Sequence, residues 1–191
     1  MGNVKLFMAL LGCKPAGRHT EQHDIFFGVA EELKLLVPEI KAFWPEAQGR
    51  IHIDAWREVT CIDNYKINVL NRADNPALSA DDVAGNKLFF INLGGYKENE
   101  FEEFHYRMLT VGSDKGVAVQ NAKQTVFYKH TGFKSADSHI DDKYGIDVDD
   151  MYEIEDILPA GIKEKYIIEI VYTGAGAEDE LHMGYFKLDK L

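Results

Sequence analysis

The sequence is short of cysteine, of basic residues and of long apolar runs, and each shortage excludes a class of protein. Two cysteines, Cys13 and Cys61, are too few for a disulfide framework, which indicates a reducing compartment. Its 21 basic side chains against 32 acidic ones give a net charge of −11, which argues against a nucleic-acid binder or a protein docked on anionic membrane. No run approaches the length of a transmembrane helix. We therefore expect a cytoplasmic protein.

The sequence contains two related segments, which we interpret as an internal duplication. At an offset of 82 residues the shared residues are Lys5-Leu6-Phe7, Leu11-Gly12, Glu21, His23 and Val29, which fall on Lys87-Leu88-Phe89, Leu93-Gly94, Glu103, His105 and Val111. After a short insertion the match resumes at an offset of 87. There His52-Ile53-Asp54, Asp63, Tyr65 and Ile67 fall on His139-Ile140-Asp141, Asp150, Tyr152 and Ile154.

Hydrophobic periodicity predicts the same ββαββ order of elements in each module. In the first module the strands are expected at 5–11, 24–29, 50–62 and 65–70, with a helix over 31–44. Pro38 should kink this helix or mark its true start. Asp63-Asn64 is a hairpin turn between the last two strands. In the second module, Ser113 or Asp114 can cap the helix.

These elements predict an α+β fold with mostly antiparallel sheets, in which two modules form a pseudo-twofold dimer within one chain. The expected organisation is a first module at 1–70, a linker at 71–86, a second module at 87–160 and a C-terminal extension at 161–191. The linker is rich in Asp, Asn, Pro, Ser and Gly and has few large apolar residues. The extension contains two further strand-like runs and is interpreted as one more β-hairpin.

The polar residues with the greatest chemical potential are Glu21, His23, His52 and Asp54. In extended chain, residues at i and i+2 share a face, so Glu21 would lie beside His23 and His52 beside Asp54. If they converge, the four are candidate ligands for a divalent metal such as zinc, manganese or iron. His23, His52 and Asp54 are equally candidates for general acid–base catalysis. The alternatives are a buried polar network that ties strands together, or two unrelated exposed pairs.

The loop after the first strand is locally basic, with Lys14, Arg18 and His19. These residues are weak candidates for binding a small anion, chiefly through the planar guanidinium of Arg18. A nucleotide-binding P-loop is excluded because Lys and Ser or Thr do not follow the second glycine, Gly17.

Cys13 adjoins this loop, and the neighbouring Lys14 and Arg18 could lower its pKa and make it a nucleophile. The second module has Gly95 at the equivalent position, so the module itself does not depend on a thiol. Cys61 aligns with Val148 and is expected to be a small core residue.

The stretch KLFMALLGCKPAGRHTEQHDIFF, continuing to KAFWPEA and RIHIDAWREV, resembles a small bacterial family of uncharacterised proteins. That family carries one or two copies of a domain of unknown function. The resemblance is strongest over 5–70, where it implies a bacterial cytosolic protein and two modules. It implies no activity, cofactor or catalytic residue. A single functional site is expected in the first module.

Three functions fit these observations. The leading hypothesis is a non-catalytic protein that binds a small molecule or another protein and forms a homodimer. The alternative is a small-molecule enzyme, for example a metal-assisted hydrolase, that uses the Glu/His/His/Asp set with Arg18 as an anion clamp. The third is a pair of modules retained for scaffolding.

Overall fold

The computed structural model describes residues 4–75, 85–96, 99–124 and 146–191. The chain divides into two compact units. The first consists of Met1–Leu78 together with Leu158–Leu191, and the second of Ser79–Ile157. Each unit combines antiparallel strands with short helices, which confirms the expected α+β class with mostly antiparallel sheets.

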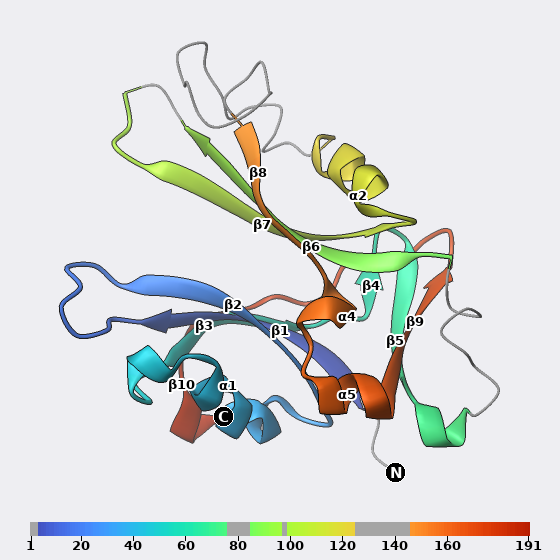
Figure 1. Cartoon of the computed structure of the whole chain (residues 1–191), viewed down its shortest axis with the longest axis horizontal. Helices are drawn as coiled ribbons and strands as arrows, with labels where there is room; N and C mark the ends of the chain where they lie inside the picture. Colours follow the sequence, from blue (N-terminus) through green and yellow to red (C-terminus); the bar gives the residue numbers. More distant parts are fainter. Residues whose placement is uncertain (1–3, 76–84, 97–98, 125–145) are drawn as a thin grey trace. The chain divides into compact units, whose positions relative to one another are not determined.

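The main sheet of the first unit has four strands in the order β10-β3-β1-β2 (Figure 1). They are β1 (Lys5–Cys13), β2 (Gln22–Ala30), β3 (His52–Glu58) and β10 (His182–Lys187), each antiparallel to its neighbours. Because successive side chains along a strand alternate in direction, one face of β1 carries Phe7, Ala9, Leu11 and Cys13 into the core.

A short helix covers this apolar face (Figure 1). The 3-10 turn η1 (Leu33–Leu36) runs into α1 (Val37–Phe43), which buries Ile40, and η2 (Pro45–Ala47) follows. Pro38 lies in the first turn of α1, where its missing N–H has no helical partner to lose. The proline therefore marks the true start of the helix, one of the two outcomes that the sequence predicted.

A second, three-stranded sheet of the first unit has the order β4-β5-β9. It contains β4 (Cys61–Ile62), β5 (Tyr65–Asn71), which leads into η3 (Arg72–Asp74), and β9 (Tyr166–Tyr172), which follows α5 (Ala160–Lys165). Asp63 and Asn64 both have positive φ, of 51° and 67°, as a two-residue hairpin turn requires. The predicted turn is thus confirmed.

The C-terminal extension does not form the expected hairpin. Strand β9 pairs with β5, whereas β10 pairs with β3 in the other sheet and leads into η4 (Leu188–Lys190). The hairpin prediction was wrong because both strands find partners much earlier in the sequence. The extension therefore completes the two sheets of the first unit.

The second unit has a three-stranded sheet in the order β7-β6-β8, with β6 (Lys87–Tyr96), β7 (Glu103–Gly112) and β8 (Ile146–Glu153). Helix α2 (Lys115–Ala122) packs Ala118 and Ala122 on one face. Asp114 is its N-cap, as predicted, and accepts a hydrogen bond from the backbone N–H of Val117 at 3.0 Å. The expected fourth strand is absent from the described residues that follow β8, where the chain forms α4 (Ile154–Ile157).

The three central strands of each unit have the same register. Lys5 pairs with Ala30 and Lys87 with Gly112, so the offset of 82 holds along the whole β1–β2 and β6–β7 pairs. Both third strands shift register opposite the same point, between Leu10 and Leu11 in the first unit and between Asn92 and Leu93 in the second.

The expected offset of 87, which applied to the match that resumes at His52, is wrong. Asp63 lies in the turn between β4 and β5, whereas Asp150 lies within β8 opposite Asn92. Tyr65 begins β5, but Tyr152 again lies in β8. The third strands are instead related through their pairing with the first strands. Glu58 lies opposite Phe7 and Glu153 lies opposite the equivalent Phe89, so the offset between β3 and β8 is 95 residues. His139 and Asp141 lie outside the described residues.

In the part of the chain that the structure describes, no helix is long and apolar enough to cross a bilayer.

Candidate functional site

The candidate site lies on the face of the main sheet that α1 leaves uncovered. Gly12 on β1 pairs with His23 on β2 and, on its other side, with His52 on β3. Directly paired residues project to the same face, so a histidine, a glycine and a second histidine form one row across three strands. Because the middle residue has no side chain, the two imidazoles have open space between them.

Two carboxylates fill this space. Glu21 immediately precedes β2, two residues before His23, and the side chains of both residues reach the cluster. Asp54 is the extra residue of a β-bulge, because Leu11 pairs with Ile53 and Leu10 with Ala55. Bulges re-aim side chains and are frequent next to functional sites. Glu21, His23, His52 and Asp54 are called the histidine cluster below.

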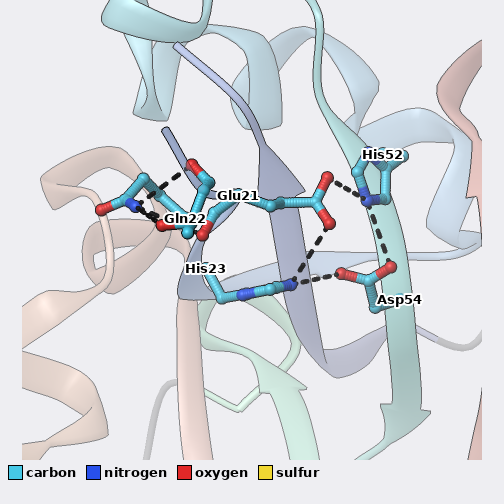
Figure 2. Close-up of polar contacts among 6 residues, drawn as sticks. Glu21, Gln22, His23, His52 and Asp54 are labelled. Carbon is cyan, nitrogen blue, oxygen red and sulfur yellow. Dashed lines mark hydrogen bonds and ion pairs between the residues drawn. The ribbon is translucent and has the colours of Figure 1, made fainter. Parts of the chain in front are cut away.

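Figure 2 shows that the four side chains form a closed ring in which imidazoles alternate with carboxylates. The Nε2 atom of His52 lies 3.3 Å from Glu21 Oε1 and 3.2 Å from Asp54 Oδ1. The Nε2 atom of His23 lies 3.2 Å from Asp54 Oδ2 and 3.8 Å from Glu21 Oε2. Each carboxylate thus presents one oxygen to each histidine, so the pair could share one cation or bridge two.

The cluster is buried on one side and open on the other. The side chain of His52 is 8% exposed, whereas those of Asp54, His23 and Glu21 are 27%, 37% and 44% exposed. His52 Nε2 and Asp54 Oδ2 are buried, and their contacts within the ring, at 3.2 and 3.3 Å, lack the geometry of hydrogen bonds. Such atoms normally cost free energy unless a partner is supplied. The ring geometry therefore leaves two buried polar atoms available to a ligand.

The imidazole of His52 packs against a side chain of the edge strand β10. The ring of Tyr185 on β10 stacks on it at a centroid distance of 4.2 Å and an interplanar angle of 29°. A Cβ atom on Gly12 would overlap His52 Nε2 and Asp54 Oδ2. Only glycine leaves room there, so the Leu11-Gly12 pair that recurs in the sequence has a structural reason at this position.

Cys13 is fully buried in the core behind the cluster. Burial raises the pKa of its thiol, Arg50 lowers this pKa and Glu21 raises it further, with a net upward direction. The expectation that Lys14 and Arg18 would activate this cysteine is therefore wrong. A buried thiol with a raised pKa is a poor nucleophile.

The basic loop does not join the histidine cluster. Lys14, Arg18 and His19 are exposed on the connection between β1 and β2. No ion pair joins any of the three to another described residue. Since β2 rather than a helix follows this loop, the exclusion of a P-loop is confirmed.

The second unit has a related but smaller cluster of Glu103, His105 and Asp149, called the second cluster below. One donor atom from each lies within 4.8 Å of the others, and His105 Nε2 is 3.3 Å from Asp149 Oδ2. Gly94 pairs with His105, and a Cβ atom on Gly94 would overlap the carboxylate of Asp149. A hydrogen bond to Glu103 raises the pKa of Tyr96.

Sequence analysis missed Asp149. Asp54 and Asp149 are both bulge residues, 95 positions apart, while the sequence match suggested Asp141 as the partner of Asp54. The only identities between His52–Glu58 and the corresponding β8 residues are Asp54/Asp149 and Glu58/Glu153. Two matches in so short a segment do not stand out from chance, so only strand pairing identifies this residue.

Comparison with known proteins extends the resemblance without adding an activity. No curated protein matches the chain. The fold resembles that of "a protein Il1583 from Idiomarina loihiensis", a crystal structure, with a TM-score of 0.64 and 19% identity over 97% of this chain and 98% of that one. At this identity the likeness concerns the fold alone. Residues 18–69, which include the whole histidine cluster, match a family described as a domain of unknown function (DUF1543).

Proposed function

We propose that the histidine cluster binds a divalent transition-metal ion and that the protein is a metal-dependent small-molecule-binding protein. The observation that carries this proposal is the convergence of two imidazole nitrogens and two carboxylates, with the buried His52 Nε2 lacking a hydrogen-bond partner. Imidazole and carboxylate together suit zinc, manganese and iron.

The distances between neighbouring donor atoms of the ring fit ligation of a cation. Two ligand atoms bound to one ion at bond lengths of about 2.1 Å lie roughly 3.0–3.4 Å apart. Three of the four nitrogen–oxygen separations are 3.2 or 3.3 Å, and the fourth is 3.8 Å. A metal would also supply the missing partner of His52 Nε2 and balance the charge of two adjacent carboxylates.

A hydrolytic enzyme is the second candidate, and the open side of the cluster favours it. Structural metal sites are enclosed by protein ligands, whereas catalytic sites keep a position for water or substrate. Glu21 and His23 are each more than a third exposed, so a small molecule could approach from their side. A bound ion would there supply Lewis-acid activation of water, and Glu21 is placed to accept a proton.

The test is elemental analysis of untagged protein purified without chelator, with His52→Ala compared with His105→Ala. We expect near-stoichiometric zinc, manganese or iron in the wild type and in His105→Ala, and background levels in His52→Ala. Added chelator should lower the melting temperature of the wild type, because a ligand that binds only the folded state stabilises it. Equal metal loss in both variants, or no metal bound on reconstitution, would contradict the proposal.

We also propose that the two units are copies of one ancestral unit. Their shared strand register, the bulge at one position and the glycine beneath the bulge carboxylate support this. An ion pair recurs as well, with Lys5–Glu58 at 2.6 Å and Lys87–Glu153 at 2.8 Å. The match of one copy to a separate domain family is in keeping with this origin.

The two cysteines support the cytosolic setting that we propose. Both are free, with Cys13 buried and Cys61 partly exposed. A partly exposed thiol persists most readily in a reducing compartment.

A further inference from the structure

A pocket of about 290 Å³ adjoins the histidine cluster. Its walls come from α1, the segment leading into β3, and the end of β10 with η4. Its charged and aromatic lining residues are Lys41, Arg50, His52, Tyr185, Lys187 and Asp189. The volume is near the lower end for small-molecule sites, so it fits a compact ligand.

The charge of this pocket is opposite to that of the whole protein. Lys41, Arg50 and Lys187 bring three positive charges to its wall and Asp189 one negative charge, on a chain whose net charge is −11. None of the three cations forms an ion pair with another described residue. Unpaired cations that converge on a concave surface attract anions, and the guanidinium of Arg50 can bind phosphate or carboxylate through two parallel hydrogen bonds.

The pocket and the histidine cluster share His52. Its Nε2 atom belongs to the ring of ligands, while its side chain also lines the pocket. Lys187 pairs with His52 across the β10–β3 ladder, and Arg50 precedes His52 by two residues. The charges of Arg50 and Glu21 both shift the pKa of the Cys13 thiol. The pocket cation and a carboxylate of the histidine cluster therefore both act on the same residue.

We propose that the pocket binds the phosphate or carboxylate group of a small anionic molecule next to the metal site. This inference rests on the proposed metal-binding function and adds the substrate class. Arg50 and Lys187 hold the anionic group, and Lys41 adds to the field from the helix. Arg18, which the sequence suggested as an anion clamp, does not line this pocket.

Calorimetric titration with inorganic phosphate, on both metal-loaded and chelator-treated protein, tests the proposal. Wild type should bind phosphate saturably in both forms. Arg50→Gln and Lys187→Gln should each weaken binding by at least about tenfold, because each removes a charge-assisted hydrogen bond. Arg18→Gln is the matched control and should bind as the wild type does. Thermal melts establish that each variant is folded, and the exposure of all three side chains favours this.

Two results would overturn the proposal: no saturable phosphate binding by the wild type, or equal weakening by Arg18→Gln and Arg50→Gln. Repeating the titration with acetate distinguishes a carboxylate site from a phosphate site. Metal content, measured on the same preparations, separates the two proposals. Phosphate binding by a wild type that holds no metal even after reconstitution would leave the pocket assignment intact and remove the metal site, whereas a metal-loaded wild type that does not bind phosphate would do the reverse.

Discussion

The histidine cluster and the second cluster occupy the same place in the strand register, yet they differ in ligands and in burial. Both have a Glu-x-His pair at the start of the second strand, a glycine on the first strand and a bulge aspartate on the third. The position of His52 corresponds in register to Asp147 in the second unit, because Gly12 pairs with one and Gly94 with the other.

The difference in burial follows from one added strand. In the first unit β10 pairs with β3 and stacks Tyr185 on His52, whereas the described part of the second sheet ends at β8. The side chains of His105 and Asp149 are 36% and 27% exposed, close to the 37% and 27% of His23 and Asp54, so the described burial differs at His52, which is 8% exposed. The second cluster offers three donors with one imidazole, against four donors with two in the histidine cluster, so we expect the second cluster to bind metal less tightly. The two units therefore share a backbone arrangement but differ in the strand that covers it and in the second histidine.

Gly12→Ala and Gly94→Ala should show the largest difference between the two units in unfolding free energy and in bound metal. The new Cβ at position 12 would displace the His52 imidazole, which Tyr185 holds in place, so we expect loss of bound metal and a cost of about 1–3 kcal/mol in unfolding free energy. At position 94 it meets only the end of the Asp149 side chain, which can rotate toward solvent. There we expect about 0.5 kcal/mol or less.

Chemical denaturation and metal analysis of the two glycine variants check this prediction. Equal costs in both units, or a Gly12→Ala protein that keeps its metal, would mean that the close packing over Gly12 does not hold the cluster together.

Asp147→His should reduce the difference in metal binding between the two clusters. The substitution places an imidazole at the register position of His52, so the second cluster would gain a second histidine beside His105. We expect the metal bound per chain to rise, and the additional ion to dissociate more readily than the first because no described strand covers the second cluster as β10 covers His52. Metal titration of this variant beside Asp147→Asn gives the measurement. If both bind equally, the histidine at this position is not what distinguishes the units.

The smallest effect concerns the matched ion pairs, Lys5–Glu58 and Lys87–Glu153. All four side chains lie at or near the surface, so Glu58→Gln and Glu153→Gln should each cost about 1 kcal/mol or less. The hydrogen bond to Glu153 raises the pKa of Lys87. Its contribution to stability is therefore present at neutral pH and up to the ordinary lysine range, and it is lost as the pH rises through the raised pKa.

Unfolding curves at neutral pH and at high alkaline pH follow this loss. The difference between wild type and Glu153→Gln should shrink at the higher pH. If the difference in unfolding free energy between wild type and Glu153→Gln grows at the higher pH instead, the prediction is wrong.

Sequence patterns predicted the local elements well. Apolar runs located β1 and β2, Pro38 marked the start of α1, Asp114 the cap of α2 and Asp63-Asn64 the turn. These features depend on short-range steric and hydrogen-bonding rules, which a sequence expresses directly. The spacing of Glu21 with His23, and of His52 with Asp54, likewise predicted which residues could lie side by side.

The errors came from long-range pairing. The extension was expected to pair with itself, but β9 and β10 belong to different sheets. The bulge residue Asp149 was missed because a bulge is defined by a partner strand, and the second module was aligned by identities that strand pairing contradicts.

The sequence by itself determined the two modules' central strands, the helix starts and the residue types that carry chemistry, because each depends on neighbours a few positions away. Only the tertiary structure decided that Glu21, His23, His52 and Asp54 contact one another over Gly12. That outcome depends on which strands pair and in which register, and on β10 arriving from the far end of the chain to cover His52. Pairing over such distances is set by the free energy of the whole sheet and its core, which no local pattern records.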